Sequence, residues 1–467
     1  MNLAILFQRS IFHGFGEILV GGVLGAFAVL TGCVSANSPL HPATRRQTVT
    51  QTPKNNPGRC TDPNDYTGSD SERINAAIQD ARRFGGVVRI SRRMPDDLAP
   101  RDFWLLDSAI LVPENTTLVF SNCRVKLSDR ARDNWIRSAN CIVGKPDVDW
   151  ISNIHILGEG NVVFEGADRP RATGDGAKPL RTKEFNRGAW QGKRWIRTTY
   201  GTDEGKAGEN PNGDWRNIGI LLAKVRNFSI QNLHLKQAHC WAVSLEYCRQ
   251  GYIQGLDFEA DEHPVLDGIT VNWLNQDGLD LRNGCRDITI ENITGRSGDD
   301  LIALTAIGAK PRPAGGTGTH FCGGDPDLEE QHVRNIVIRN VRGYSAGGHY
   351  IVRFLNQNGV KMTGILVDGI LDASPAGHRC YSAIKIGDQY YGTPAKPGET
   401  SRFQITNVQT QAENAITIGS PVTDSQFSNI LFFQSAPDKE FILFQGGRHE
   451  LPNVTFQNCQ TIPSPKQ

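Results

Sequence analysis

The chain has 467 residues with 50 Lys and Arg against 49 Asp and Glu, so its formal net charge is +1. A charge this close to zero argues against a general nucleic-acid binder, because such proteins usually carry a basic excess. The length allows two or three ordinary domains or one repetitive domain.

The N-terminus has the pattern of an export signal. Arg9 precedes an apolar run over 18–30, and the run ends in Leu-Thr-Gly-Cys at 30–33. Small residues directly before a cysteine resemble the bacterial lipobox, in which the cysteine is acylated; the alternative is an ordinary signal peptide followed by a chance cysteine. We therefore expect a lipoprotein signal peptide at 1–32, lipidation at Cys33 and a place in the bacterial cell envelope, periplasmic or on the cell surface.

Residues 33–57 are rich in Ser, Thr, Pro, Asn and Gln and hold almost no large apolar side chain. Such a segment cannot bury enough surface to fold and is typical of a flexible tether. We expect it to join the lipid anchor, which would be the only membrane contact, to a folded body over 58–462.

Ten cysteines are present, and export would place them where disulfides are allowed. Without Cys33 the number is odd, so at least one has no partner within the chain. Cys240 and Cys248 are close enough in sequence to pair, but sequence does not give the connectivity. Buried, unreactive cysteine is the default for most of them, and no zinc-ligand spacing occurs.

The folded body begins with an amphipathic pattern. A capping residue, Ser69, precedes apolar residues at helical spacing, and two glycines at 85–86 end the pattern. This predicts a helix of about three turns over 69–81, followed by a strand over 87–90. We expect the helix to cover one open end of a β-stack.

A short signature then recurs: a polar residue, often Asn, followed by apolar residues at alternate positions and closed by Asn or Gly. Copies begin at Asn153, Asn227, Asp287, Asn335, Arg402, Ser428 and Asn453. Many separations are close to ~24 residues or a multiple of it, and one such unit cannot bury its apolar face alone. The pattern predicts an all-β, single-stranded, right-handed parallel β-helix with an N-terminal capping helix, and it fits a propeller or leucine-rich repeats less well. Asn suits the turns because it tolerates left-handed backbone.

Two acidic motifs lie one repeat apart. Asp277 and Asp280 belong to Asn-Gln-Asp-Gly-Leu-Asp, and Asp299 and Asp300 follow in Ser-Gly-Asp-Asp. Neighbouring coils are about 4.8 Å apart, so we expect the carboxylates to converge on one face. Like charges at that range raise at least one pKa, which gives a proton donor beside a carboxylate that can activate water, as glycoside hydrolysis requires. The alternative is that Asp277 and Asp280 cap turns.

These motifs resemble the polygalacturonase family, glycoside hydrolase family 28. That family carries Asn-Thr-Asp, then Asp-Asp about one coil later, then Gly-His-Gly and Arg-Ile-Lys, all at one cleft of a right-handed parallel β-helix, and it inverts the anomeric carbon. The resemblance covers most of 60–460. It implies an inverting O-glycosyl hydrolase that acts on an acidic or decorated polysaccharide and uses no cofactor or metal.

The resemblance assigns roles to residues of this chain. Asp277 matches the first motif, and Asp299 and Asp300 match the second. Asp300 or its neighbour would protonate the leaving oxygen, and the other aspartates would hold and activate water. His349 stands where Gly-His-Gly is expected, with a tyrosine in place of the last glycine, and Lys385 matches the lysine of Arg-Ile-Lys.

Two departures put pectin specificity in question, namely the residue at position 383 and the insertion over 308–330, which separates the second motif from the third. Ala383 replaces the arginine that grips the substrate carboxylate in the family, and a lysine does not supply the same bidentate clamp. Arg353 either substitutes for it or is only a charge on the strand surface. His239 and Trp241 match the family's coil before the active one and would contact substrate.

Two insertions interrupt the repeats. The segment 168–217 interleaves Trp and Tyr with Arg and Lys, and 308–330 is rich in Gly and Pro. The first either contacts sugar rings and acidic groups or is a solvated face. Beside the hydrolase, two other functions fit the fold: a polysaccharide lyase and a non-catalytic carbohydrate-binding β-helix. In each case we expect a monomer whose partner is a polysaccharide and not a nucleic acid.

Overall fold

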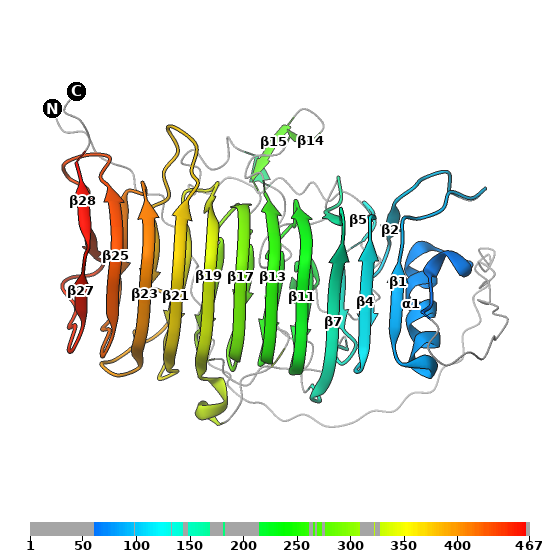
Figure 1. Ribbon diagram of the computed structural model, residues 1–467, viewed down its shortest axis with the longest axis horizontal. Helices are drawn as coiled ribbons and strands as arrows, with labels where there is room; N and C mark the ends of the chain where they lie inside the picture. The colour runs from blue at the N-terminus through cyan, green and yellow to red at the C-terminus, as the bar shows by residue number, and fades with distance from the viewer. Residues whose placement is uncertain are drawn as a thin grey trace, which may run out of the picture. The chain divides into compact units, whose positions relative to one another are not determined.

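The fold was examined in a computed structural model (Figure 1). It describes residues 60–463 except 98, 132, 143–147, 169–180, 183–213, 261–264, 267–268, 273–275, 309–321 and 323–326. These residues belong to one compact unit. The signal peptide, the tether and Cys33 lie outside the described residues and stay predictions. Among the described helices, none is both long and apolar enough to cross a membrane.

The first element of the body is the helix α1 (Asp70–Ala81). The Ser69 hydroxyl accepts from the backbone N–H of Glu72, whose carboxylate accepts from the N–H of Ser69, a reciprocal cap that satisfies two otherwise unpaired donors. The helix ends in a 3₁₀ turn, η2 (Arg82–Phe84), and Gly85 takes the left-handed conformation after it. The predicted helix and the strand at 87–90 are confirmed.

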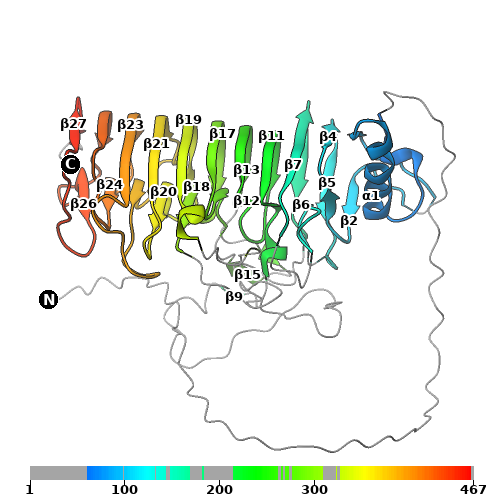
Figure 2. The same cartoon turned by 90° about the horizontal axis from the view of Figure 1, so that it is seen from below.

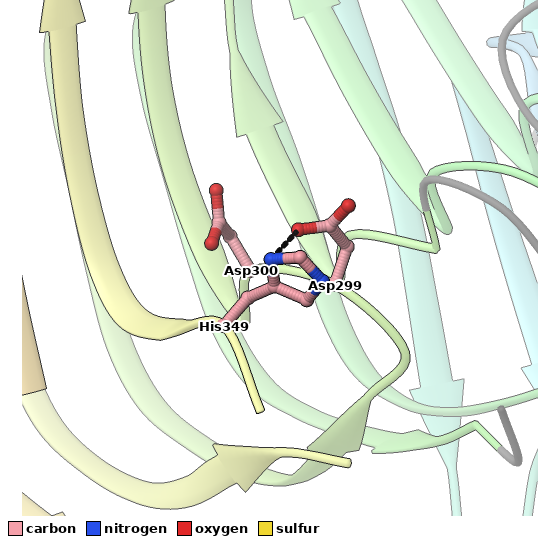
Figure 3. A group of neighbouring side chains, drawn as sticks. All are labelled: Asp299, Asp300 and His349. Atoms are coloured by element: carbon pink, nitrogen blue, oxygen red, sulfur yellow. Dashed lines mark ion pairs between the residues drawn. The ribbon is translucent and has the colours of Figure 1, made fainter. Parts of the chain in front are cut away.

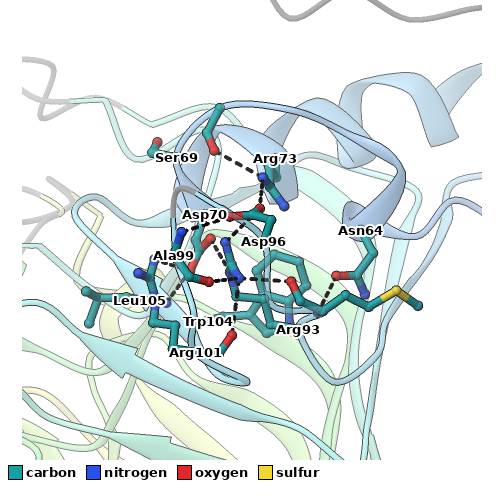
Figure 4. A network of polar contacts seen from close by, with 12 residues as sticks. Asn64, Ser69, Asp70, Arg73, Arg93, Asp96, Ala99, Arg101, Trp104 and Leu105 are labelled. Atoms are coloured by element: carbon teal, nitrogen blue, oxygen red, sulfur yellow. Dashed lines mark hydrogen bonds and ion pairs between the residues drawn. The ribbon is translucent and has the colours of Figure 1, made fainter.

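A polar network ties α1 to the following loop (Figure 4). Asp70 is buried at the start of the helix and pairs with Arg93 at 2.8 Å and with Arg101 at 2.9 Å. Its carboxylate also accepts from the backbone N–H of Leu105 at 2.7 Å. The helix is therefore held by hydrogen bonds as well as by its apolar face.

Two long parallel sheets make the rest of the body, and the chain alternates between them. In Figure 1 the strands of the first sheet lie side by side from β1, next to α1, to the C-terminal strands. Its strands are β1 (Val87–Ile90), β2 (Trp104–Leu106), β4 (Thr116–Ser121), β5 (Arg124–Leu127), β7 (Ile151–Glu159), β8 (Val163–Glu165), β11 (Val225–Lys236), β13 (Arg249–Glu259), β17 (Arg286–Ser297), β19 (Val333–Ser345), β21 (Met362–Asp372), β23 (Thr400–Thr410), β25 (Gln426–Phe433), β27 (Thr455–Gln457) and β28 (Gln460–Ile462).

The second sheet, seen beside the first in Figure 2, has shorter strands. They are β3 (Ile110–Val112), β6 (Ile136–Ser138), β10 (Ile220–Ala223), β12 (Val243–Glu246), β16 (Leu279–Leu281), β18 (Ile302–Ala306), β20 (Tyr350–Asn356), β22 (Ser382–Ile386), β24 (Asn414–Ile418) and β26 (Ile442–Phe444). Alternate residues of both sheets, such as Ile290 and Leu304, meet in one continuous core. This is the predicted parallel β-helix.

A ladder of asparagines runs along the first sheet, inside its long strands. Asn153, Asn227, Asn335 and Asn407 have positive φ, the left-handed conformation that Asn tolerates. Side-chain amides also bond from coil to coil, as from Asn227 to Asn153 at 2.6 Å. The left-handed backbone predicted for the recurring Asn residues is therefore confirmed, but these residues lie inside long strands and not in separate turns.

The nine described cysteines form no disulfide, so the suggested pairing of Cys240 with Cys248 is wrong. Seven of the nine are buried, among them Cys240 and Cys248, while Cys60 is exposed. The two thiols are buried in different clusters, since Cys248 packs in the core and Cys240 in a second, outer cluster with Trp241. Buried unreactive cysteine is the rule in the described body.

Candidate active site

The second sheet carries a row of mostly polar residues on its outer face. Asp280 of β16 pairs in register with Ala303 of β18, Ala303 with Arg353 of β20, and Arg353 with Lys385 of β22. In each strand the residues on both sides, such as Leu279 and Leu281, pack in the core. Because side chains alternate along a strand, the row points away from the core.

The turns that lead into these strands carry the other predicted groups. Asp277 precedes β16, Asp299 and Asp300 precede β18, and His349 precedes β20. A Cβ at Gly347 would lie 2.1 Å from the carbonyl oxygen of Gly298. Only glycine permits this close stacking of the turns, which sets His349 beside Asp299.

Three of the four groups predicted as catalytic, Asp299, Asp300 and His349, lie side by side (Figure 3), and Asp277 is bonded to the backbone of Asp300. The Asp277 carboxylate accepts from the backbone N–H of Asp300 at 3.1 Å. His349 Nδ1 lies 3.3 Å from Asp299 Oδ1. One carboxylate oxygen from each of Asp299 and Asp300 and one ring nitrogen of His349 lie within 4.8 Å of one another. The expected convergence of adjacent coils is therefore present in the structure.

The members of this cluster differ in access to solvent. The side chains of His349 and Asp299 are 42% and 21% exposed, whereas Asp277 and Asp300 are buried. A ligand arriving from solvent would therefore meet Asp299 and His349 first and find Asp300 and Asp277 behind them.

Arg353 and Lys385 form an ion network with two buried carboxylates. Arg353 donates to Asp300 at 3.2 Å and to Asp388 at 3.0 Å, and Lys385 Nζ donates to Asp388 at 2.7 Å. Lys385 is 4% exposed, so it is no solvated strand end. Arg353 faces the carboxylates, which excludes the interpretation as a mere surface charge. Ala383 is buried and, by strand alternation, lies on the same face of β22 as Lys385, so the position matched to the family's arginine adds no cation to this network.

Burial dominates the electrostatics of the carboxylates. It raises the pKa of Asp277 well above its usual range, and the charges of Asp280, Asp299 and Asp300 raise it further. Burial also raises the pKa of Asp300, but there the charge of Arg353 opposes the shift. Asp277 is thus the side chain that favours a proton, while Asp300 has a fixed cation that favours its ionised form.

Asp280, expected on the shared acidic face but given no catalytic role, also belongs to the cluster. Burial raises its pKa well above the usual range, against the opposing charge of Arg282. Neither of its oxygens accepts a hydrogen bond from a donor in the described residues, and Asp277 is close enough to bond it when one of the two carries a proton. The signal was in the sequence: Asp277 and Asp280 share one motif, and Asp280 sits at an outward position between two leucines.

The structure does not bring His239 and Trp241 into contact with these carboxylates. His239 is buried, its Nε2 lies 3.3 Å from the carbonyl oxygen of Ala167, and burial lowers its pKa to about 4. The Trp241 ring is 4% exposed in the outer cluster, with Arg282 4.3 Å from its centroid. Trp241 therefore reaches the cluster through Arg282 and not through an open face.

The long insertion 168–217 lies mostly outside the described residues. Its strand β9 (Arg181–Thr182) pairs antiparallel with β15 (Ile269–Asn272), which pairs with β14 (Val265–Leu266). This small sheet joins the insertion to the segment just before Asp277. Trp215, counted among the aromatic residues suited to sugar contact, is instead buried in the outer cluster.

Two further features bear on ligands. Asp299, Asp300 and His349 present three ligand atoms at a spacing that suits a cation, so the expectation of no metal stays a prediction. A cavity of about 530 Å³ lies elsewhere, over the outer face of the first sheet, and His155, Ser229 and Tyr252 line it. No predicted site residue lines that cavity.

The comparisons with known proteins support the fold. No protein-family model and no curated protein sequence matches the chain. Among solved structures, PfbA, a surface adhesin of Streptococcus pneumoniae, has a TM-score of 0.50 at 12% identity over 86% of this chain and 90% of that one. An endo-xylogalacturonan hydrolase from Aspergillus tubingensis has a TM-score of 0.46 at 12% identity, covering 85% and 90%. A family 28 exopolygalacturonase from Yersinia enterocolitica has 0.43 at 14%, covering 88% and 79%.

Proposed function

We propose that this chain is a glycoside hydrolase of the polygalacturonase type that cleaves a polysaccharide with inversion. The observation that carries the proposal is the meeting of Asp277, Asp299, Asp300 and His349 in the turns before three successive strands, with one side open to solvent. A carboxylic acid and a carboxylate across one position are the groups that glycosidic cleavage needs.

The roles follow from access and charge. Asp299 is partly exposed beside His349, so in our proposal it donates the proton to the leaving glycosidic oxygen, with His349 holding its carboxyl group in place. Asp300, paired with Arg353, is in our proposal the base that takes a proton from the attacking water. Asp277, bonded to the Asp300 backbone, completes the binding of that water. Attack opposite to the leaving oxygen inverts the anomeric carbon.

A product screen over a panel of polysaccharides tests this function. We expect reducing ends to appear with one polymer, and the loss of a catalytic carboxylate in Asp299→Asn or Asp300→Asn to lower the rate by about 10²–10⁴-fold. Asp368→Asn is the matched control, since Asp368 lies on the first sheet and bonds Asn407, so this variant should keep the full rate.

Two outcomes would contradict the proposal. Products with a new double bond, detected by ultraviolet absorbance, would assign a lyase. Binding to a polysaccharide without any product, unchanged in Asp300→Asn, would assign a carbohydrate-binding protein.

A further inference from the structure

Asp388 binds both cations of the ion network. Its Oδ2 accepts from Lys385 Nζ at 2.7 Å and from an Arg353 Nη at 3.0 Å. The remaining Nη of Arg353 donates to Asp300. The positive charges of Arg353 and Lys385 are thus balanced by carboxylates of the protein itself, those of Asp388 and Asp300.

The network is also closed to solvent. The side chains of Asp388 and Lys385 are 2% and 4% exposed, and that of Arg353 is 14% exposed. The Tyr350 ring lies 4.9 Å from Lys385 Nζ, and the Tyr391 ring lies 5.2 Å from Arg353 Cζ. A substrate carboxylate that paired with either cation would have to displace Asp388, and at Arg353 it would also compete with Asp300.

Such a displacement is unfavourable. It would exchange one carboxylate for another at the same cations and leave Asp388 buried without a partner, and removing one partner of a buried ion pair is far more costly than losing an exposed one. The open side of the site offers a substrate the carboxylate of Asp299 and the ring of His349, whose Nδ1 already faces Asp299. An acidic sugar would therefore meet a negative group and no unoccupied cation of this network.

We propose that Asp388 is a specificity-determining residue, which acts as a built-in counter-ion for Arg353 and Lys385, so that the sugar bound against Asp299 and His349 is neutral. The substrate at this position is a hexose or pentose, or an esterified uronate, and not a free uronate. This inference rests on the proposed function. The sequence suggests an acidic or decorated polymer as substrate, and the inference adds that the sugar unit at the point of cleavage carries no charge.

The test uses pairs of polysaccharides that differ only in charge: galacturonan, glucuronan and alginate, each before and after carboxyl reduction, together with neutral plant and bacterial glycans. Binding is measured by affinity electrophoresis with Asp277→Asn, which retains Asp299 and Asp388. We expect the preferred polymer to be neutral and to bind at least about tenfold more tightly than its acidic counterpart. In Asp277→Asn/Asp388→Asn, the uncovered cations should raise the affinity for acidic polymers about tenfold, because a charge-assisted hydrogen bond contributes that much.

Control variants keep the test decisive. Asp277→Asn/Asp368→Asn makes the same change of charge on the first sheet and should leave the preference unchanged. If Asp388→Asn does not fold, as judged by circular dichroism, the comparison of neutral and acidic polymers on Asp277→Asn decides alone. Equal or tighter binding of the acidic polymers would overturn the proposal, as would failure of every neutral polymer to bind.

Failure of the specificity can be told apart from failure of the proposed function. If the wild type releases products only from acidic polymers, the hydrolase stands and the role of Asp388 falls. If neutral polymers bind selectively but yield no product, the role of Asp388 stands and catalysis falls. Acidic binding that is lost in Arg379→Ala would overturn the proposal and assign recognition to that arginine, whose neighbour Tyr381 bonds the Gly348–His349 backbone.

Discussion

At the scale of single residues, Arg353 is the side chain on which the site's electrostatics depend. It donates to Asp300 and to Asp388, and it opposes the rise that burial causes in the pKa of Asp300. In the proposed mechanism Asp300 is the general base. A general base works only when it is ionised, so its contribution to the rate is lost as pH falls through its pKa. The position of that pKa is therefore a direct measure of what Arg353 does.

The first prediction concerns this pKa. In Arg353→Met the charge that lowers the pKa of Asp300 is gone, so the pKa rises and the acidic limb of the kcat/KM profile moves to higher pH. Arg353→Lys keeps a positive charge but loses the guanidinium group, which pairs with two carboxylates at once. This variant should give a smaller shift of the acidic limb in the same direction. The measurement is the pH–rate profile on the polymer found in the screen. An acidic limb that stays in place in Arg353→Met would show that Asp300 is not the base.

Part of the site could be predicted from the sequence, because the position of these residues depends only on the length of the repeat. Asp277 and Asp300 are one coil apart, and stacking alone brings them together. His239 and Trp241 could not be placed the same way, since whether they face inward depends on Ala167 and Arg282, which pack against them. Asp388 was missed because its partners become visible only when Arg353 and Lys385 are seen in neighbouring strands.

At the scale of elements, α1 was predictable because its signals are local. Ser69, Glu72 and the apolar spacing lie within one short segment, and Ile74, Ala77, Ile78 and Ala81 are all fully buried. The network around Asp70 was not foreseen, because Arg93 and Arg101 come from the following loop. A local sequence pattern determines where a helix begins. The ion pairs of the helix depend on residues from a later segment that folds back onto it.

The second prediction tests this cap. Ser69→Ala removes the acceptor for the Glu72 N–H and should lower the free energy of unfolding by about 1 kcal/mol. Ser69→Thr keeps a hydroxyl group at the same place, which can accept from the Glu72 N–H and donate to the Glu72 carboxylate, and should stay close to the wild type. Urea denaturation followed by circular dichroism measures both, and equal loss in the two variants would mean that the hydroxyl group does not act as a cap.

At the scale of the whole β-helix, each coil pairs only with the coils beside it. Stability in such a stack is a sum of neighbouring interfaces. One end is covered by α1, and the strands β27 and β28 at the other end have mostly exposed side chains. The strand β18, in the middle, has every residue buried.

The third prediction follows from the difference in burial between the C-terminal strands and the central strands. Amide hydrogen exchange should be fastest in β26–β28 and slowest in the central strands β13, β17 and β19, because local opening is easiest where few neighbours hold a strand. Exchange followed by mass spectrometry after proteolysis measures it. Uniform protection from β1 to β28 would mean that the coils open together as one cooperative unit.

The order of the coils also has a consequence for protein engineering. The carboxylate cluster and the ion network of Arg353 and Lys385 come from four successive coils, those of β16, β18, β20 and β22. Their contacts run between neighbouring coils. Hence their geometry is carried by one uninterrupted piece of chain. That piece could be transplanted into another parallel β-helix of matching coil size, and coils added beyond β24 would lengthen the scaffold without moving the carboxylates.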